Sequence, residues 1–162
     1  MSRTGTGTLP VRRATAADAA ALFALSEPSM ASGELRRRRP ADYRSPEDRF
    51  LLVDGPSGPD GCVALRLLAP ELPAHPAPGL VHNFCVREGL RGVGLGSQLL
   101  DALLDEAGRH GVRTLVTAST GGGALFRRYG FEEIPAALAP RAWADRLDPA
   151  RRSLVFLRTL EG

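Results

Sequence analysis

The chain has 162 residues, of which 43% are hydrophobic and 24% are charged, and its formal net charge is +3. This length and composition predict one folded domain that can bury its own core. All 21 basic residues are arginines. The lack of lysine excludes a P-loop nucleotide site and a pyridoxal phosphate enzyme, because both need one.

No stretch is apolar for long enough to cross a bilayer, and the first residues lack the apolar region of a secretory signal. We therefore expect a disordered N-terminal extension at 1–8, a single domain over 9–162, and a cytoplasmic protein with no membrane partner. Scattered arginines and 6% aromatic residues do not favour a nucleic-acid partner. Cys62 and Cys85 lie in apolar runs and read as reduced core thiols, with a disulfide as the open alternative. No Cys/His spacing indicates a metal site.

The first half of the chain predicts a strand, two helices and an antiparallel hairpin, in this order: 9–14, 16–27, 34–39, and the paired strands 49–54 and 61–68. Thr15 is the expected N-cap of the first helix, and Asp18 lies three residues later, as in a capping box. Pro40 is expected to end the second helix. A proline-rich connection then leads to the second half.

The second half predicts three strands that alternate with two helices, in this order: 80–86, 93–110, 112–119, 124–128 and 153–160. The long helix has a repeating apolar face made of Leu95, Leu99, Leu100, Leu103, Leu104 and Ala107. This order of elements predicts an α/β (α+β) fold, a mixed sheet with helices on both faces.

The strand at 80–86 meets the long helix through the glycine-rich turn Arg91-Gly92-Val93-Gly94-Leu95-Gly96. Backbone N–H groups at such a helix start form an anion site, for which a pyrophosphate is the natural ligand. A dinucleotide fingerprint fails, because Ser97 and Leu99 stand where a glycine or alanine would be needed. The pattern Arg-x-x-Gly-x-Gly is fully met, and a turn that binds nothing is the alternative.

Together with the strand Phe84-Cys85-Val86 before it, the helix after it, and the run 124–131 that ends in Tyr-Gly-Phe, this motif resembles the GNAT superfamily of acetyl-CoA-dependent N-acetyltransferases. The resemblance covers residues 79–133 closely. It implies a mostly antiparallel mixed sheet of six or seven strands, acetyl-CoA as the co-substrate, no metal, and a homodimer. It also implies transfer of an acetyl group to a primary amine.

By this resemblance, the residues that contact the cofactor are Phe84, Cys85, Val86, Arg91, Gly92, Val93, Gly94, Leu95, Gly96, Ser97, Ser119, Thr120 and Phe126. The backbone of 84–86 would pair with the pantetheine arm, and the Val86 N–H would stabilise the oxyanion of the tetrahedral intermediate. Residues 91–97 would bind the pyrophosphate. Ser119 and Thr120 would touch the pantetheine from the other side, or else cap the next helix.

Two positions depart from the family pattern. Phe126 stands where many members have a tyrosine that acts as general acid, and Leu80 stands where many have a glutamate base. His82 is the predicted replacement base, because residues 80, 82, 84 and 86 of an unbroken strand share one face. A hydrogen-bonded structural histidine is the alternative.

The C-terminal region is similar to that of the N-acetylglutamate synthase group, which also carries phenylalanine at the position of Phe126. If this similarity holds, arginines from Arg36 to Arg39, together with Arg151 or Arg152, would bind the carboxylates of an amino-acid acceptor such as glutamate, and Arg36, Arg39 and Arg152 are the predicted set. A solvated helix face is the alternative for the arginine run. A member of the fold that binds acetyl-CoA and regulates a partner without turnover is the alternative function.

Overall fold

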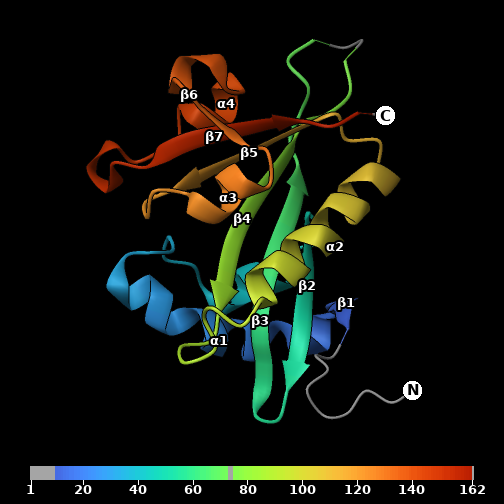
Figure 1. Cartoon of the computed structure of the whole chain (residues 1–162), viewed down its shortest axis with the longest axis vertical. Helices are drawn as coiled ribbons and strands as arrows, with labels where there is room; N and C mark the ends of the chain where they lie inside the picture. Colours follow the sequence, from blue (N-terminus) through green and yellow to red (C-terminus); the bar gives the residue numbers. More distant parts are fainter. Residues whose placement is uncertain (1–9, 73–74, 162) are drawn as a thin grey trace.

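The computed structural model describes residues 10–72 and 75–161, so the extension predicted at 1–8 lies outside the described residues. Seven strands form one sheet in the order β1-β2-β3-β4-β5-β7-β6 (Figure 1). Neighbouring strands are antiparallel except β4 and β5, which are parallel. The strands are β1 (Val11–Arg13), β2 (Asp48–Gly55), β3 (Gly58–Leu67), β4 (Gly79–Val86), β5 (Thr114–Ser119), β6 (Glu132–Ile134) and β7 (Leu154–Thr159).

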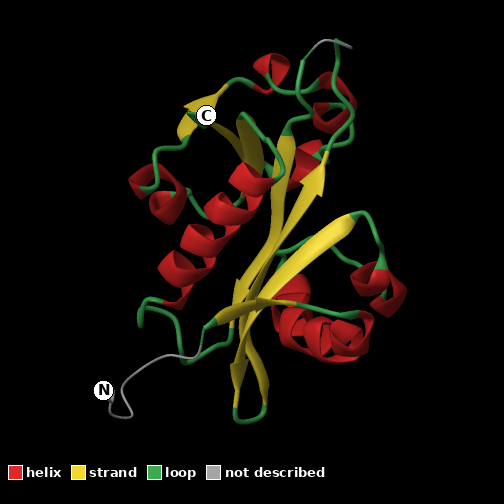
Figure 2. Cartoon of the chain, turned by 90° about the vertical axis from the view of Figure 1, so that its right-hand side faces the viewer, coloured by secondary structure: helices red, strands yellow, loops and turns green. Residues whose placement is uncertain are grey.

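Helices cover both faces of the sheet, as Figure 2 shows for the two longest ones. They are α1 (Ala19–Ser32), α2 (Leu95–Arg109), α3 (Ala124–Arg128) and α4 (Arg141–Ala144), with a 3-10 helix, η2 (Pro40–Arg44), after α1. The first core includes α2, α3 and one face of the sheet. The second core includes α1, η2 and the opposite face. The predicted fold class is confirmed.

The predicted apolar face of α2 makes up much of the first core. Leu99, Leu100, Leu103 and Ala107 are all fully buried, and Leu95 is 4% exposed. Burial of one leucine side chain contributes about 1.5–3 kcal/mol, so this row anchors α2 firmly to the sheet. The N-terminal end of α2 is thereby held beside the C-terminal end of β4.

Helix α1 is longer than predicted, because it continues through Pro28 to Ser32. Ser29 and Met30 are buried, so tertiary packing holds the last turn in place despite the N–H that proline lacks. Gly33 ends the helix in the left-handed conformation, with φ 88°.

The prediction of a helix over 34–39 is wrong, because the structure has an irregular segment there. Its backbone N–H groups have partners outside a helix: Leu35 donates to the Ser29 carbonyl and Arg38 to the Met30 sulfur. Arg39 is extended, as expected for a residue before proline. The short elements β6 and α4 were not predicted. In the described part of the chain, no helix combines the length and apolar character that a membrane crossing requires.

Candidate active-site cleft

The sheet opens between β4 and β5. Their ladder joins only Gly79 to Leu115 and Leu80 to Val116. At the apex of the opening, the Thr117 hydroxyl donates a hydrogen bond of 2.7 Å to the Val81 carbonyl. Beyond this point β5 continues beside β7, and no ladder joins it to the C-terminal half of β4. The backbone edge of residues 83–86 therefore lines a gap.

A β-bulge lies in β4 at the edge of this gap. Cys62 pairs with Cys85 and Ala64 with His82, so two residues of β4, Asn83 and Phe84, lie opposite the single residue between them. Asn83 takes a φ of 49°, which few non-glycine residues adopt.

The bulge corrects the predicted strand face. His82 lies opposite Ala64 and beside Phe50, both in the core under α1. Phe84 and Val86 pack instead against the core under α2. The extra residue reverses the alternation of side chains, so His82 and Val86 do not share a face.

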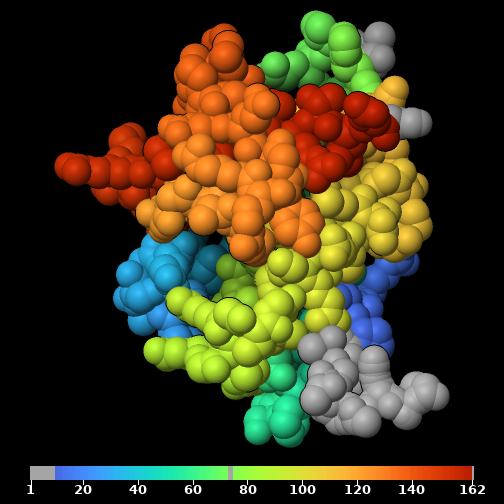
Figure 3. Space-filling model, viewed as in Figure 1, coloured from blue at the N-terminus to red at the C-terminus, as the bar shows by residue number. Residues whose placement is uncertain are grey.

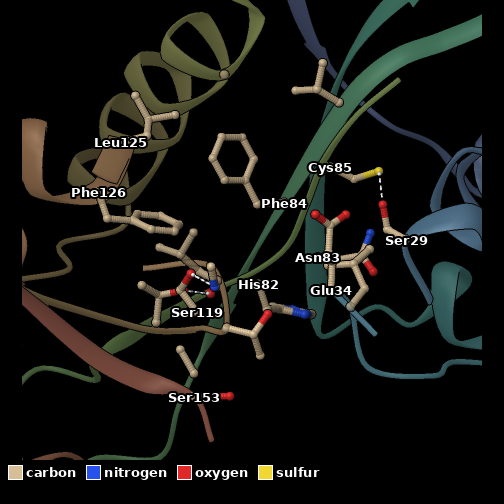
Figure 4. A pocket seen from close by; sticks show the side chains of 18 of the residues that line it. Ser29, Glu34, His82, Asn83, Phe84, Cys85, Ser119, Leu125, Phe126 and Ser153 are labelled. Atoms are coloured by element: carbon tan, nitrogen blue, oxygen red, sulfur yellow. Dashed lines mark hydrogen bonds between the residues drawn. The ribbon is translucent and has the colours of Figure 1, made fainter. Parts of the chain in front are cut away.

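The bulge is held by the buried Asn83 side chain (Figure 4). Its Oδ1 accepts from the Tyr43 hydroxyl at 2.9 Å, and its Nδ2 donates to Ser26 Oγ at 3.0 Å. Cys62 and Cys85 are free and buried, as predicted. Burial raises the pKa of Cys62 to about 12 and also raises the pKa of Cys85, so both stay protonated.

The direction of the Val86 N–H follows from the hydrogen bond of the next residue, Arg87, and this N–H faces the gap. The Arg87 N–H donates to the Asp60 carbonyl on the β3 side at 2.7 Å. Successive N–H groups of a strand point to opposite edges, so the Val86 N–H points away from β3, toward β5. This N–H is a hydrogen-bond donor at the edge of the gap.

The glycine turn lies at the mouth of the gap. Gly92 and Gly94 have φ values of 88° and 92°, which glycine adopts without strain. Gly94 is the N-cap of α2, and among the described residues no side-chain hydrogen bond caps this helix end. The first N–H groups of α2 are therefore available to an anion, and the helix dipole favours one there.

A cavity of about 640 Å³ fills the gap, and Figure 3 shows a hollow between the light-blue surface near residues 30–40 and the orange surface of the β5–α3 region. Most of the predicted site residues line this cavity: Arg36, His82, Phe84, Cys85, Val86, Arg91, Gly92, Gly94, Gly96, Ser97, Ser119, Thr120 and Phe126. The labelled side chains in Figure 4 come from both sides of the opening.

Two predicted cofactor residues, Val93 and Leu95, do not line the cavity. Val93 is 58% exposed and Leu95 is in the core. The N-cap of α3 is Gly123, so the hydroxyls of Ser119 and Thr120 do not cap this helix. The Ser119 hydroxyl instead accepts from the Gly121 N–H at 3.2 Å.

Of the predicted set Arg36, Arg39 and Arg152, only Arg36 lines the cavity. Arg38 lines it with Arg36, whereas Arg39 is exposed and pairs with Asp42. A helix would align residues 36 and 39, but the observed irregular segment brings 36 and 38 to the cavity. Further along the chain, Arg151 lines the cavity in place of Arg152, which adopts a left-handed conformation after a short 3-10 turn. The local sequence does not indicate which of Arg151 and Arg152 lines the cavity.

The sequence also missed Glu34, whose contacts cross the cavity mouth. Its carboxylate accepts from the Arg91 guanidinium at 3.1 and 3.4 Å, and its backbone carbonyl accepts from Arg151 at 3.3 Å. Both Glu34 and Arg91 side chains are about half exposed, at 53% and 52%. The segment after α1 is thus joined to the glycine turn and to the C-terminal region.

The aromatic residues beyond Gly123 provide no hydroxyl to the cavity. The Phe126 ring is buried against Phe84, Phe131 and Phe156. Tyr129 donates its hydroxyl to the Ser97 carbonyl at 3.1 Å, so it fastens α3 to α2.

His82 is 10% exposed, and both of its ring nitrogens have partners. Nδ1 lies 2.8 Å from Arg38 Nη2, and Nε2 lies 2.9 Å from Asp48 Oδ1. Burial and the Arg38 charge lower the pKa of His82 against the opposing effect of Asp48. Within the described ranges, no group of three His, Cys, Asp or Glu side chains is arranged to hold a metal ion.

The sheet thus opens between two parallel strands, and the N-terminus of a helix lies at the mouth of the opening. The chain belongs to the GNAT acetyltransferase family: the family described as "Acetyltransferase (GNAT) domain" matches residues 46–133.

Curated relatives support this membership. An amino-acid acetyltransferase of Vibrio cholerae is 29% identical over 150 residues, which cover 93% of this chain and 33% of the relative. An L-methionine sulfoximine/L-methionine sulfone acetyltransferase of Pseudomonas aeruginosa is 46% identical over 55 residues, or 32% of each chain. The chain thus spans about a third of the length of the Vibrio relative, whereas only about a third of the chain aligns with the Pseudomonas relative.

Among solved structures, N-acetylglutamate synthase from Neisseria gonorrhoeae, complexed with coenzyme A and N-acetyl-glutamate, has a TM-score of 0.82. It is 24% identical, and the alignment covers 96% of this chain and 36% of that one. This likeness supports the fold.

Proposed function

We propose that this chain transfers the acetyl group of acetyl-CoA to the primary amine of a small carboxylate-bearing acceptor, an amino acid. The observation that carries the proposal is the gap between β4 and β5, with the Val86 N–H at its edge and the glycine turn at its mouth. The amino-acid acetyltransferase relatives and the complex of N-acetylglutamate synthase with coenzyme A support the choice of cofactor and acceptor class.

In this proposal, acetyl-CoA binds along β4. The pantetheine arm pairs with the free backbone edge of 84–86, and the pyrophosphate accepts hydrogen bonds from the N–H groups of the glycine turn, residues 91–97. Arg91 neutralises part of the phosphate charge. Ser119 and Thr120 contact the pantetheine from the β5 side, and Phe126 forms the apolar wall beside the thioester.

The amine nitrogen attacks the thioester carbonyl carbon, and its lone pair forms the new C–N bond. The carbonyl oxygen becomes an oxyanion, which the Val86 N–H stabilises. The nitrogen gives one proton to water, and collapse of the intermediate breaks the C–S bond and releases the coenzyme A thiolate. Phe126 has no proton to donate, so the thiolate takes its proton from water.

The acceptor's carboxylate is proposed to pair with arginines of the cavity wall. Arg36, Arg38 and Arg151 reach the cavity from two sides of the opening. Guanidinium groups suit this role because they bind carboxylates through two parallel hydrogen bonds. The observed cavity wall favours Arg38 over Arg39 and Arg151 over Arg152.

The predicted base, His82, would need to give up a contact to accept the ammonium proton. Arginine only donates, so its bond to Nδ1 occupies the one free lone pair of a neutral imidazole. A base role therefore requires Arg38 to move away first.

The proposal is tested by measuring coenzyme A binding by calorimetry and thiol release from acetyl-CoA with amino acids and polyamines. We expect binding and amino-acid-dependent thiol release. Binding without release by any amine would favour the alternative, a regulator that binds acetyl-CoA without turnover. The absence of binding would contradict both. The homodimer implied by the family stays a prediction that sedimentation analysis can measure.

A further inference from the structure

A chain of hydrogen bonds runs from Arg66 through the largely buried side chains of Asp48 and His82 to the cavity wall. Arg66 donates two bonds of 2.8 Å to the Asp48 carboxylate, which is 1% exposed. Asp48 Oδ1 also lies 2.9 Å from His82 Nε2, and His82 Nδ1 lies 2.8 Å from Arg38 Nη2. Arg38 lines the cavity. The array therefore joins β3, β2 and β4 to the segment after α1.

The partners of His82 decide its tautomer. A guanidinium has no acceptor atom, so Nδ1 must be unprotonated and must accept from Arg38. Nε2 then carries the proton and donates it to Asp48. Burial acts to raise the pKa of Asp48, but the bonds from His82 and Arg66 outweigh it and hold that pKa well below the usual range. The carboxylate stays ionised and keeps His82 in this tautomer.

In the hydrogen-bonded array of Arg66, Asp48, His82 and Arg38, the positive charge of Arg38 is not paired with a carboxylate of its own. Asp48 is already bound bidentately by Arg66, and the group next to Arg38 is a neutral imidazole. Among the ion pairs of the described residues, none joins Arg38 to a carboxylate. Burial of this guanidinium lowers its pKa, and the charge of Asp48 opposes that shift only in part. An anionic ligand in the cavity would supply the missing charge.

We propose that His82 is a positioning residue for the acceptor: held by Asp48 in its Nε2–H tautomer, it aims the Arg38 guanidinium at the carboxylate of the amino-acid substrate. The inference rests on the proposed function and replaces the predicted role of His82 as base. It agrees with the bulge at Asn83, which turns His82 away from the face of Val86.

The array gives acceptor binding a pH dependence. The charged groups that face His82 are Asp48 from β2, Arg66 from β3 and Arg38 from the segment after α1, and Tyr43 of η2 lies near Arg38. The pKa of His82 is lowered, so the ring is neutral at pH 7. Protonation at lower pH would place an N–H against the guanidinium and break the bond. Acceptor affinity is therefore lost as pH falls through the lowered pKa.

The test compares two variants, His82→Gln and His82→Ala. A glutamine can accept from Arg38 and donate to Asp48 but cannot act as a base, whereas alanine does neither. The probes are L-glutamate with isoglutamine and L-methionine with L-methioninamide, pairs that differ in the α-carboxylate. Calorimetry on the coenzyme A-saturated protein measures acceptor affinity, and thiol release measures KM and kcat.

We expect His82→Ala to weaken binding of the carboxylate probes roughly ten- to hundredfold, as for the loss of a hydrogen bond to a charged group, and to leave the amides and coenzyme A nearly unchanged. His82→Gln should retain affinity and kcat within about threefold and lose the acid limb of the pH profile. This rescue separates positioning from a general loss of structure in the alanine variant.

A kcat that falls as far in His82→Gln as in His82→Ala would overturn the inference in favour of the base role. An unaltered protein that binds coenzyme A but has equal affinity for acids and amides would overturn it too. These failures differ from that of the proposed function, which fails if the unaltered protein does not bind coenzyme A.

Discussion

Among the glycines that line the cavity, Gly96 has the closest neighbours. A Cβ at this position would lie 2.9 Å from Leu125 Cδ2 and 3.3 Å from Phe84 Cζ, both on side chains of the cavity wall. The third glycine of the turn is thus needed for close packing, whereas Gly92 and Gly94 are needed for their backbone conformations.

We predict opposite effects of one substitution at two positions of α2. Gly96→Ala should lower the free energy of unfolding by about 1–2 kcal/mol because Leu125 and Phe84 must shift, and it should weaken coenzyme A binding. Gly108→Ala has open space around the new methyl group and should stabilise the protein by about 0.5–1 kcal/mol. Urea denaturation measures both. Equal effects at the two positions would contradict the packing argument.

If coenzyme A binds as proposed, Glu34 in the segment after α1 would compete with its pyrophosphate for Arg91 of the glycine turn. Arg91 cannot bind Glu34 and a pyrophosphate with the same N–H groups. The contact is half exposed, so its contribution is small. Cofactor binding should therefore release Glu34 at a modest cost.

Glu34→Gln should tighten coenzyme A binding about two- to fivefold, because Arg91 no longer has a competing carboxylate. Glu27→Gln makes the same change of charge on the exposed surface of α1 and is the matched control. Calorimetry at low salt measures both affinities. Weaker binding by Glu34→Gln, or the same gain in Glu27→Gln, would contradict direct competition.

At the scale of helices and strands, the features that could be predicted from the sequence are those that have a local sequence signal. The leucine period of α2 and the glycine turn before it are local signals, so the positions of the helix and of the turn were predicted correctly, whereas the anion site at this turn stays a prediction. The bulge at Asn83 was not predicted, because it depends on Tyr43 and Ser26, which are distant in the sequence. The irregular segment at 34–39 likewise depends on tertiary contacts, which changed the arginines at the cavity.

At the scale of the whole molecule, the sheet has two parts, β1–β4 and β5-β7-β6. Within the described residues, the only ladder that joins one part to the other is the short one between β4 and β5. Thr117 extends this junction by its bond to the Val81 carbonyl and is 2% exposed. The opening between β4 and β5 therefore leaves the two parts joined over a short distance.

Thr117→Val should lower the free energy of unfolding by about 1–2 kcal/mol, since a buried carbonyl loses its donor while the shape is kept. Thr114→Val, at the half-buried start of the same strand, is the control and should change it less. Urea denaturation measures the difference. An unchanged midpoint for Thr117→Val would show that this bond does not contribute to the junction.

The structure of the protein crystallised with coenzyme A tests the central claim most directly. We predict the pyrophosphate within hydrogen-bonding distance of backbone N–H groups between residues 92 and 97, the pantetheine beside 84–86, and Arg91 turned from Glu34 to phosphate. Coenzyme A bound elsewhere, with the β4–β5 gap unfilled, would contradict the account.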